Sequence, residues 1–345
     1  MTASTEPRRI RPGKSGAPRR RYTSAGTRTE AFGPSEWGLL AVVACLWGSS
    51  FLFIDIGLQA FDPGVVGAAR LLLGAAALAL VPRARRAVAR EDYPRIAALG
   101  LVWMGAPMLL FPYAQQWIDS SVAGMLNGAV PLATAAWSVL LLRRIPRRVQ
   151  LLGLLVGFVG IVAISWPELA GSRATAIGAG LVVLAVVLYG LAANLAVPLQ
   201  QRYGALPVLL RAQLVALVVV VPFGVAGLPR STWSWPSALA MLPLGVLGTG
   251  LAFVLMTTLV GRVGAPRGAV AIYFVPVVAI ALGALVLDER ITLAAIIGTV
   301  LVLVGAVLAS RRETPIMPLA GDRAASAAPR RWSPRRPRPA RDPGG

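Results

Sequence analysis

The sequence consists mainly of long apolar stretches that are separated by short loops containing arginine. A helix needs about 20 apolar residues to cross the hydrocarbon core, and only helices or closed barrels satisfy the backbone there. A β-barrel would need short alternating segments, which this sequence lacks. We therefore expect an all-α integral membrane protein with ten transmembrane helices. Their expected ranges are 37–58, 64–82, 95–116, 121–142, 149–166, 176–197, 207–227, 238–260, 267–287 and 292–310.

The composition excludes several classes of protein. Charged residues make up 14% of the chain, against about 25% in soluble proteins, yet the net charge is +20. The absence of histidine and a single cysteine, Cys45, argue against disulfides, Cys/His metal sites and Cys/His catalytic pairs. The basic residues are arginines apart from Lys14, and they flank apolar segments without interleaved aromatic residues. Nucleic acid is therefore not an expected partner.

The arginines predict the orientation of the chain, because translocated loops avoid positive charge. With the N-terminus in the cytoplasm, the outside loops contain only Arg173, Arg230 and Arg290. Ten crossings also return the C-terminus to the cytoplasm. The segments 1–36 and 311–345 are basic and polar, so we expect both to be disordered and cytoplasmic. The inside loops contain Arg83, Arg85, Arg86, Arg90, Arg95, Arg143, Arg144, Arg147, Arg148, Arg202, Arg262 and Arg267.

The chain contains an internal repeat. The segment that begins at Val130 matches the segment that begins at Val275, and this predicts five-helix units at 37–166 and 176–310. Because five is odd, the second unit must be inserted upside down relative to the first. Inverted repeats around a midplane site are typical of secondary transporters. The matched residues are Pro131 with Pro276, Gly153 with Gly298, Gly160 with Gly305, and Ser165 with Ser310.

Several motifs together resemble one family. They are LWGSSFLF (46–53), Arg70 in GAARLLLG, the prolines Pro131 and Pro276, and VLDERITLAAIIGTVLVLVG (286–305). With these motifs, residues 37–310 resemble EamA-type permeases of the drug/metabolite transporter superfamily. The resemblance implies a ten-helix carrier of the cytoplasmic membrane that moves small metabolites, often outward, through a central cavity, with no cofactor and no covalent catalysis.

Two ionisable residues lie inside the first two expected spans. A charge at the bilayer centre costs about 2.5–3.5 kcal/mol on insertion scales, so Asp55 and Arg70 need a partner or a function. They could pair with each other, or each could reach the interface. The functional alternative is that Asp55 binds a proton or a cationic group of the substrate during transport.

Polar and aromatic residues within the spans are candidates for the translocation path. Each could instead join neighbouring helices. The prolines are included because each removes a backbone hydrogen bond, and unwound turns at matching depth in inverted halves indicate a binding site. The candidate residues are Trp47, Ser50, Trp103, Asn127, Pro131, Tyr189, Asn194, Tyr273 and Pro276.

These features predict a secondary-active transporter, by preference an exporter of amino acids or related metabolites, that works by alternating access. An uptake permease is the first alternative. An integral-membrane lipid enzyme is the lesser alternative. It would require clustered carboxylates or histidines at one membrane face, and the sequence offers only the pairs Glu91–Asp92 and Asp288–Glu289, which we expect on opposite sides. The expected partners of the protein are a small-molecule substrate and the lipid bilayer. Coupling to a proton or a counter-substrate, and a homodimer, are left open.

Overall fold

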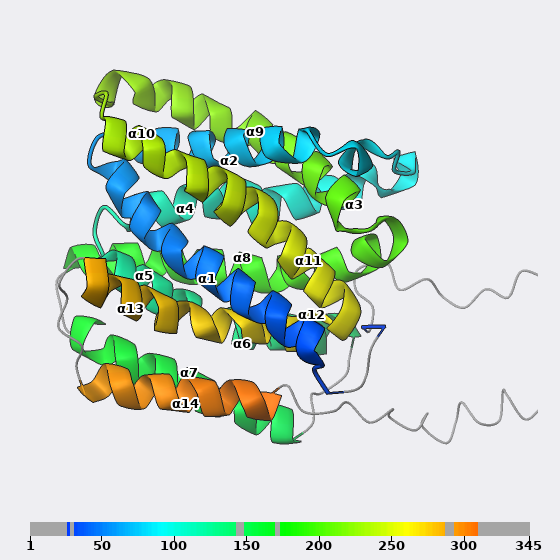
Figure 1. Ribbon diagram of the computed structural model, residues 1–345, viewed down its shortest axis with the longest axis vertical. Helices are drawn as coiled ribbons and strands as arrows, with labels where there is room; N and C mark the ends of the chain where they lie inside the picture. Colours follow the sequence, from blue (N-terminus) through cyan, green and yellow to red (C-terminus); the bar gives the residue numbers. More distant parts are fainter. Residues whose placement is uncertain (1–25, 28–30, 143–147, 170–172, 287–292, 310–345) are drawn as a thin grey trace, which may run out of the picture. The chain divides into compact units, whose positions relative to one another are not determined.

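The computed structural model describes residues 26–27, 31–142, 148–169, 173–286 and 293–309. Within these residues every regular element is helical, as Figure 1 shows. Between residues 34 and 169, the elements are α1 Pro34–Leu58, α2 Pro63–Ala79, η1 Pro82–Arg85, η2 Arg90–Asp92, α3 Tyr93–Gly100, η3 Leu101–Gly105, α4 Ala106–Ala114, α5 Ser120–Asn127, α6 Val130–Leu142 and α7 Arg148–Leu169.

The second part of the chain continues in the same way. Its elements are α8 Arg173–Tyr203, α9 Ala205–Gly227, η4 Leu228–Arg230, α10 Trp235–Leu242, η5 Pro243–Leu251, α11 Ala252–Val263, α12 Ala265–Gly268, η6 Ala269–Phe274, α13 Val275–Val286 and α14 Leu293–Ala309. The expected basic segments 1–36 and 311–345 lie largely or wholly outside the described residues.

Several helical stretches are suited to a membrane by length and composition. The described residues contain six such stretches, at Pro34–Leu58, Arg90–Ala114, Ala176–Tyr203, Ala205–Arg230, Trp235–Val263 and Ala265–Val286. Shorter apolar helices occur at Pro63–Ala79, Arg148–Ala163 and Ile296–Leu308. The expectation of an all-helical membrane protein is confirmed.

The helices pack in a pattern that relates the two halves. Helix α2 packs against α9, and α7 packs against α14. Helix α1 packs against α10, α11 and α13, whereas its expected counterpart α8 packs against α3, α4, α5 and α6. Figure 1 shows α7 beside α14 and α2 beside α9. Each of these contacts therefore has a counterpart between the corresponding helices when the first five expected helices are matched with the last five.

Two expected helices are interrupted next to a proline. The range 121–142 divides into α5 and α6, with Pro131 in the first turn of α6. In the range 267–287 the tighter segment η6 precedes α13, and Pro276 lies in the first turn of α13. A proline costs little in a first turn, where its missing N–H has no partner in the helix. Both prolines therefore start a new helix.

Two other expected helices are widened by π-helical turns, at η3 in the range 95–116 and at η5 in the range 238–260. Such turns shift the backbone hydrogen bonds by one residue and are frequent at functional sites. In η5 the carbonyl oxygens of Gly248 and Thr249 accept hydrogen bonds from side chains of α1 and α9. These two hydrogen bonds thus join η5 to α1 and α9.

Glycines of α7 and α14 lie against each other. A Cβ atom built on Gly305 of α14 would lie 2.5 Å from the Gly157 backbone nitrogen and 2.7 Å from the Gly153 carbonyl oxygen of α7. One built on Gly160 would lie 2.7 Å from the Gly298 carbonyl oxygen. Close approach of α7 and α14 therefore accounts for this glycine spacing.

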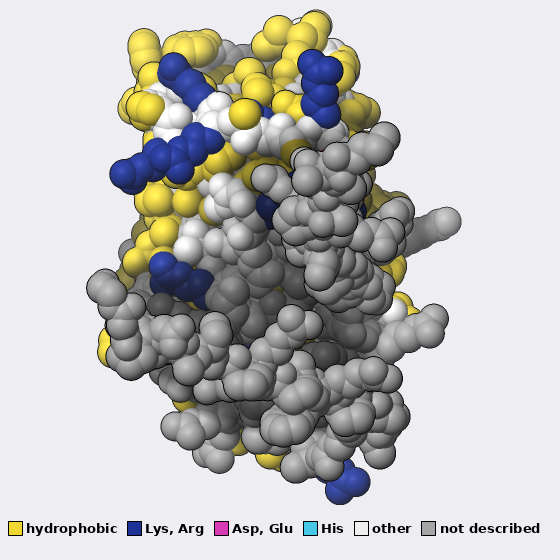
Figure 2. Space-filling model, turned by 90° about the vertical axis from the view of Figure 1, so that its right-hand side faces the viewer, with side chains coloured by type: hydrophobic (Ala, Val, Ile, Leu, Met, Phe, Trp, Pro, Cys, Tyr) yellow, Lys and Arg dark blue, Asp and Glu magenta, His cyan; other side chains and the backbone are white. Residues whose placement is uncertain are grey.

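One end of the bundle carries many arginines. Segment η1, which follows α2, contacts α9, and α3 contacts both α8 and α9 at this end. Figure 2 looks onto this end and shows basic side chains around the described helix ends. The side chains of Arg83, Arg85, Arg86 and Arg90 are exposed there.

Candidate functional site

A small central cavity brings together five of the residues named from the sequence. Its volume is about 20 Å³, which is room for about one water molecule. The lining comes from α1, α2, α4, α5 and α8, so it includes both halves of the chain. The lining residues are Trp47, Ser50, Phe51, Ile54, Arg70, Phe111, Asn127 and Tyr189.

Helix α1 supplies one wall of the cavity. Trp47, Ser50, Phe51 and Ile54 are spaced by three or four residues, which places them on one face of a helix. The indole N–H of Trp47 donates a hydrogen bond to the Gly248 carbonyl oxygen at 3.0 Å, so the ring is held against η5. Trp47 and Ser50 are among the residues predicted from the sequence, whereas Phe51 and Ile54 are not, although helical spacing from Trp47 identifies both.

Aromatic rings form the opposite wall. The ring of Phe111 lies between those of Phe51 and Tyr189, with centroid distances of 5.6 and 5.7 Å. Phe111 was also missed from the sequence. Its position next to Pro112 in an apolar helix gave no signal, since a core phenylalanine has the same surroundings in the sequence.

Trp103 lies outside the cavity lining and contacts it through Phe253. Its ring packs edge-on against Phe253 at 5.3 Å, and Phe253 packs against Trp47 at 5.0 Å. Trp103 is not among the lining residues. Its contribution is to fix the orientation of Trp47 through Phe253.

Arg70 is a buried cation at the cavity. Its side chain is 4% exposed, and its Nε–H donates to the Thr249 hydroxyl at 3.1 Å. The Thr249 hydroxyl donates in turn to the Leu244 carbonyl oxygen, and Gln213 donates to the Thr249 carbonyl oxygen. Within the described residues no carboxylate forms an ion pair with Arg70. A buried charge without a counter-ion is costly in a membrane, so its presence indicates a function.

Asn127 ends α5 at the same cavity. This residue is 3% exposed, and its Oδ1 atom has no hydrogen-bond partner among the described residues. An unpaired buried amide oxygen costs about 1–3 kcal/mol. Asn127 lies at the break between α5 and α6, and its Oδ1 atom is a candidate to accept a hydrogen bond from a ligand.

The other candidates lie away from the lining. The Asn194 amide donates to the carbonyl oxygens of Thr134 and Gly190, which joins α8 to α6. The Tyr273 hydroxyl donates to the Leu154 carbonyl oxygen at 3.0 Å, which joins η6 to α7. Pro131 and Pro276 are buried in the first turns of their helices. These four residues shape the helices around the cavity.

Asp55 does not form an ion pair with Arg70 in this structure. It lies partly buried on α1, within electrostatic range of Asp119 and of the Gln59 side chain. The Asp55–Arg70 pair, one of the alternatives left open by the sequence, is therefore not formed in this structure.

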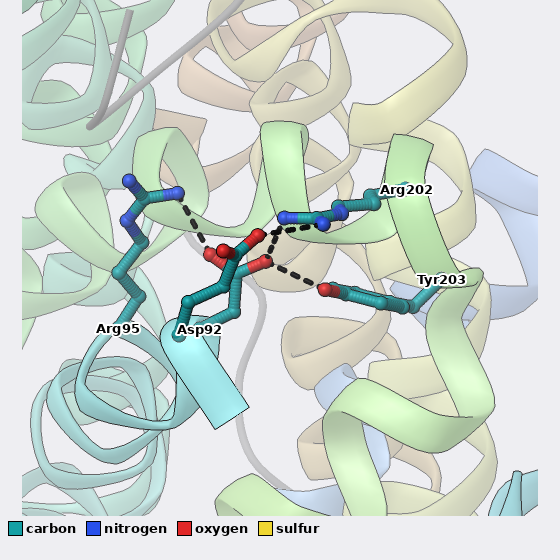
Figure 3. Close-up of polar contacts among 5 residues, drawn as sticks. Asp92, Arg95, Arg202 and Tyr203 are labelled. Atoms are coloured by element: carbon teal, nitrogen blue, oxygen red, sulfur yellow. Dashed lines mark hydrogen bonds and ion pairs between the residues drawn. The ribbon is translucent and has the colours of Figure 1, made fainter. Parts of the chain in front are cut away.

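A polar cluster closes the arginine-rich end and joins the two halves (Figure 3). The Asp92 carboxylate is 2% exposed and contacts Arg95 at 2.9 Å and Arg202 at 2.6 Å. The Tyr203 hydroxyl donates to it at 2.7 Å, and Arg202 also pairs with Glu91. We call these five residues the Asp92 cluster. It connects the segment between α2 and α3 with the end of α8.

A second connection lies at the opposite end. Arg230 pairs with Asp62 at 2.8 Å, and the Ser231 hydroxyl accepts a hydrogen bond from the Asp62 backbone N–H. The Asp62 carboxylate also accepts from the Gly64 N–H and so caps α2. We call Asp62 and Arg230 the Asp62 pair. Both connections were missed from the sequence, because the partners are more than 100 residues apart.

Similar proteins are found in bacteria and archaea. An "uncharacterized transporter" of Archaeoglobus fulgidus is 24% identical over 81% of this chain and 99% of that protein. A "probable terminal-alkyne amino-acid exporter" of Streptantibioticus cattleyicolor is 27% identical over 80% of this chain and 93% of that protein. One crystal structure, 18% identical, matches 80% of this chain and 97% of its own with a TM-score of 0.63, and so has the same fold.

The sequence matches the EamA-like transporter family twice, at residues 36–166 and 176–311. These matches cover most of the chain. The relatives named as transporters align along nearly their whole length. The chain therefore belongs to the EamA-like transporter family and is a multi-pass membrane transporter, not an enzyme.

Proposed function

We propose that this transporter is a secondary-active carrier that exports small metabolites, such as amino acids, across the cell membrane. The observation that carries the proposal is the central cavity, which combines a buried cation, an unpaired amide oxygen and aromatic walls. The exporter of Streptantibioticus cattleyicolor, which aligns along 93% of its length, supports an amino-acid substrate and outward direction.

Alternating access requires that each side of the cavity can close. The Asp92 cluster connects the segment between α2 and α3 with the end of α8, and the Asp62 pair connects the start of α2 with the end of α9. They lie at opposite ends of the bundle, as expected for two closures that open in turn. Opening one closure while the other stays intact would expose the cavity to one side only.

The proposed architecture has ten crossings in two inverted repeats, 37–166 and 176–310, with both termini in the cytoplasm. Three features support this architecture: corresponding helices of the two halves make corresponding contacts, both halves are interrupted near a proline (Pro131 and Pro276), and both contain a widened segment (η3 and η5). Reporter fusions test the orientation. A fluorescent protein fused after residue 345 should fluoresce, and alkaline phosphatase there should be inactive. An active phosphatase at that position would contradict the topology.

Transport itself is tested with the purified protein in lipid vesicles. Vesicles loaded with unlabelled amino acid should accumulate the labelled compound transiently, because a carrier exchanges solutes through one site. A channel would give no such counterflow, and this outcome would overturn the carrier. Direction is measured in cells, where a strain lacking the protein should retain the substrate in the cytosol. Retention outside the cells would favour the uptake permease.

Asp55 is the proposed coupling residue. It lies partly buried on α1 and interacts electrostatically with Asp119, the residue that precedes α5. The Asp55→Asn protein should retain counterflow, which needs no net proton movement, but lose accumulation driven by a pH gradient. Unchanged gradient-driven transport would exclude a coupling role.

A further inference from the structure

We propose that the central cavity binds the head group of an α-amino acid, with Arg70 binding the carboxylate and Asn127 Oδ1 accepting a hydrogen bond from the ammonium group. This inference rests on the proposed function and names the substrate groups that the site recognises. It assigns a separate role to each of two side chains.

Arg70 is suited to bind an anion from the cavity. Its Nε–H donates a hydrogen bond to the Thr249 hydroxyl, which fixes the side chain, and Arg70 lines the cavity. The described residues offer no carboxylate as its counter-ion, so a carboxylate brought by the solute would neutralise a charge that is otherwise buried alone. Guanidinium and carboxylate groups form the strongest class of hydrogen bonds between side chains and ligands.

Asn127 supplies the complementary group. Its Oδ1 atom is buried without a partner in the described residues and belongs to a side chain that lines the same cavity. An ammonium group on the solute would satisfy this acceptor. A solute that carries both groups is a zwitterion, so its entry would leave the net charge of the site unchanged.

The remaining lining residues restrict what else the solute can carry. Most of them are apolar or aromatic, and Ser50 and Tyr189 also carry a hydroxyl group. The remaining lining residues are Trp47, Ser50, Phe51, Ile54, Phe111 and Tyr189. A cation without a carboxylate would be repelled by Arg70. The cavity of about 20 Å³ holds about one water molecule. An amino acid therefore needs the aromatic walls to move apart, which alternating access allows.

The test begins with the solute. Purified protein in lipid nanodiscs is titrated with a panel of neutral L-amino acids, and binding is followed by calorimetry. The amino acid that binds best is then compared with its amide, which lacks the carboxylate, and with the carboxylic acid that lacks the amino group. For leucine these are leucinamide and 4-methylpentanoate. The amide should bind at least about tenfold more weakly, and the deamino acid should also lose affinity.

Variants assign each loss to one side chain. Arg70→Gln should bring the amino acid to the affinity of its amide. Asn127→Leu should bring it to the affinity of the deamino acid, whose own binding should not change. Arg211→Gln is the matched control, because Arg211 donates to the Pro207 and Ala84 carbonyl oxygens and does not line the cavity. It should leave all three affinities unchanged.

Each outcome decides a separate statement. Equal binding of the amino acid and its amide to the wild-type protein overturns the role of Arg70, even where the Arg70→Gln protein fails to fold. If no amino acid binds, but vesicles show counterflow of another solute, the inference fails while the carrier stands. If neither binding nor counterflow is found for any solute, the proposed function fails as well.

Discussion

Two tyrosines within the expected spans have different neighbours. Tyr273 is fully buried, and its hydroxyl donates to the Leu154 carbonyl oxygen. Tyr189 is partly buried, and its ring lines the cavity beside Phe111. The sequence predicts that both lie within spans. It does not distinguish them, since the partner of each hydroxyl depends on which helix packs opposite.

Removal of each hydroxyl should separate stability from transport. Tyr273→Phe loses one buried hydrogen bond, so its unfolding free energy should fall by about 1 kcal/mol while the KM for transport stays unchanged. Tyr189→Phe should leave the unfolding free energy within about 0.5 kcal/mol and raise the KM. Thermal unfolding in detergent and counterflow in vesicles measure the two effects. A raised KM for Tyr273→Phe would place its hydroxyl in the path.

At the scale of elements, the apolar pattern predicts where helices occur but not how they are interrupted. The breaks before Pro131 and Pro276 follow from the missing proline N–H, so the sequence could indicate them. The wide turns η3 and η5 were not predicted. An extra residue in one turn leaves composition and hydrophobicity unchanged. In η5, the Gly248 and Thr249 carbonyl oxygens accept hydrogen bonds from side chains of other helices, which the local sequence does not reveal.

The contact between α7 and α14 gives a prediction at this scale. Gly305→Ala should lower the unfolding free energy by about 1–3 kcal/mol, because the added methyl group would meet the backbone of Gly157 and Gly153. Gly180→Ala on α8 is the control, since no atom lies within 4 Å of its added Cβ. That variant should be neutral or gain up to about 1 kcal/mol from helix propensity. Equal effects of the two variants would exclude this close packing as the cause.

At the scale of the whole molecule, the two closures differ in strength. The Asp92 carboxylate is 2% exposed and has three side-chain partners. The Asp62 carboxylate is 9% exposed and pairs with Arg230, whose side chain is 63% exposed, against 42% for Arg202. An exposed ion pair contributes about 0–1 kcal/mol. The sequence predicted two related halves, but it could not show which loops meet. That information lies in contacts between residues far apart in the chain.

This difference predicts how the access equilibrium responds to the loss of each closure. Ser50→Cys, in a chain where Cys45 is replaced by alanine, places a reporter thiol on the cavity wall. Asp92→Asn removes the charge that holds Arg95 and Arg202, so labelling by an impermeant maleimide from the cytoplasmic side should rise at least about tenfold, a shift of 1.4 kcal/mol. Asp62→Asn should raise labelling from the external side by at most about fivefold, because it loses only one exposed pair.

Arg85→Gln is the control for the Asp92→Asn measurement. Arg85 lies at the same end of the bundle, but its Nε–H donates to the Ala79 carbonyl oxygen and it forms no described ion pair. Its loss should not change labelling from either side. If Asp92→Asn raised labelling from the external side, the Asp92 cluster would not act as the cytoplasmic closure. If it left labelling unchanged from both sides in a monodisperse protein, the cluster would only stabilise the fold, and the gating role would have to be assigned to other contacts between the halves.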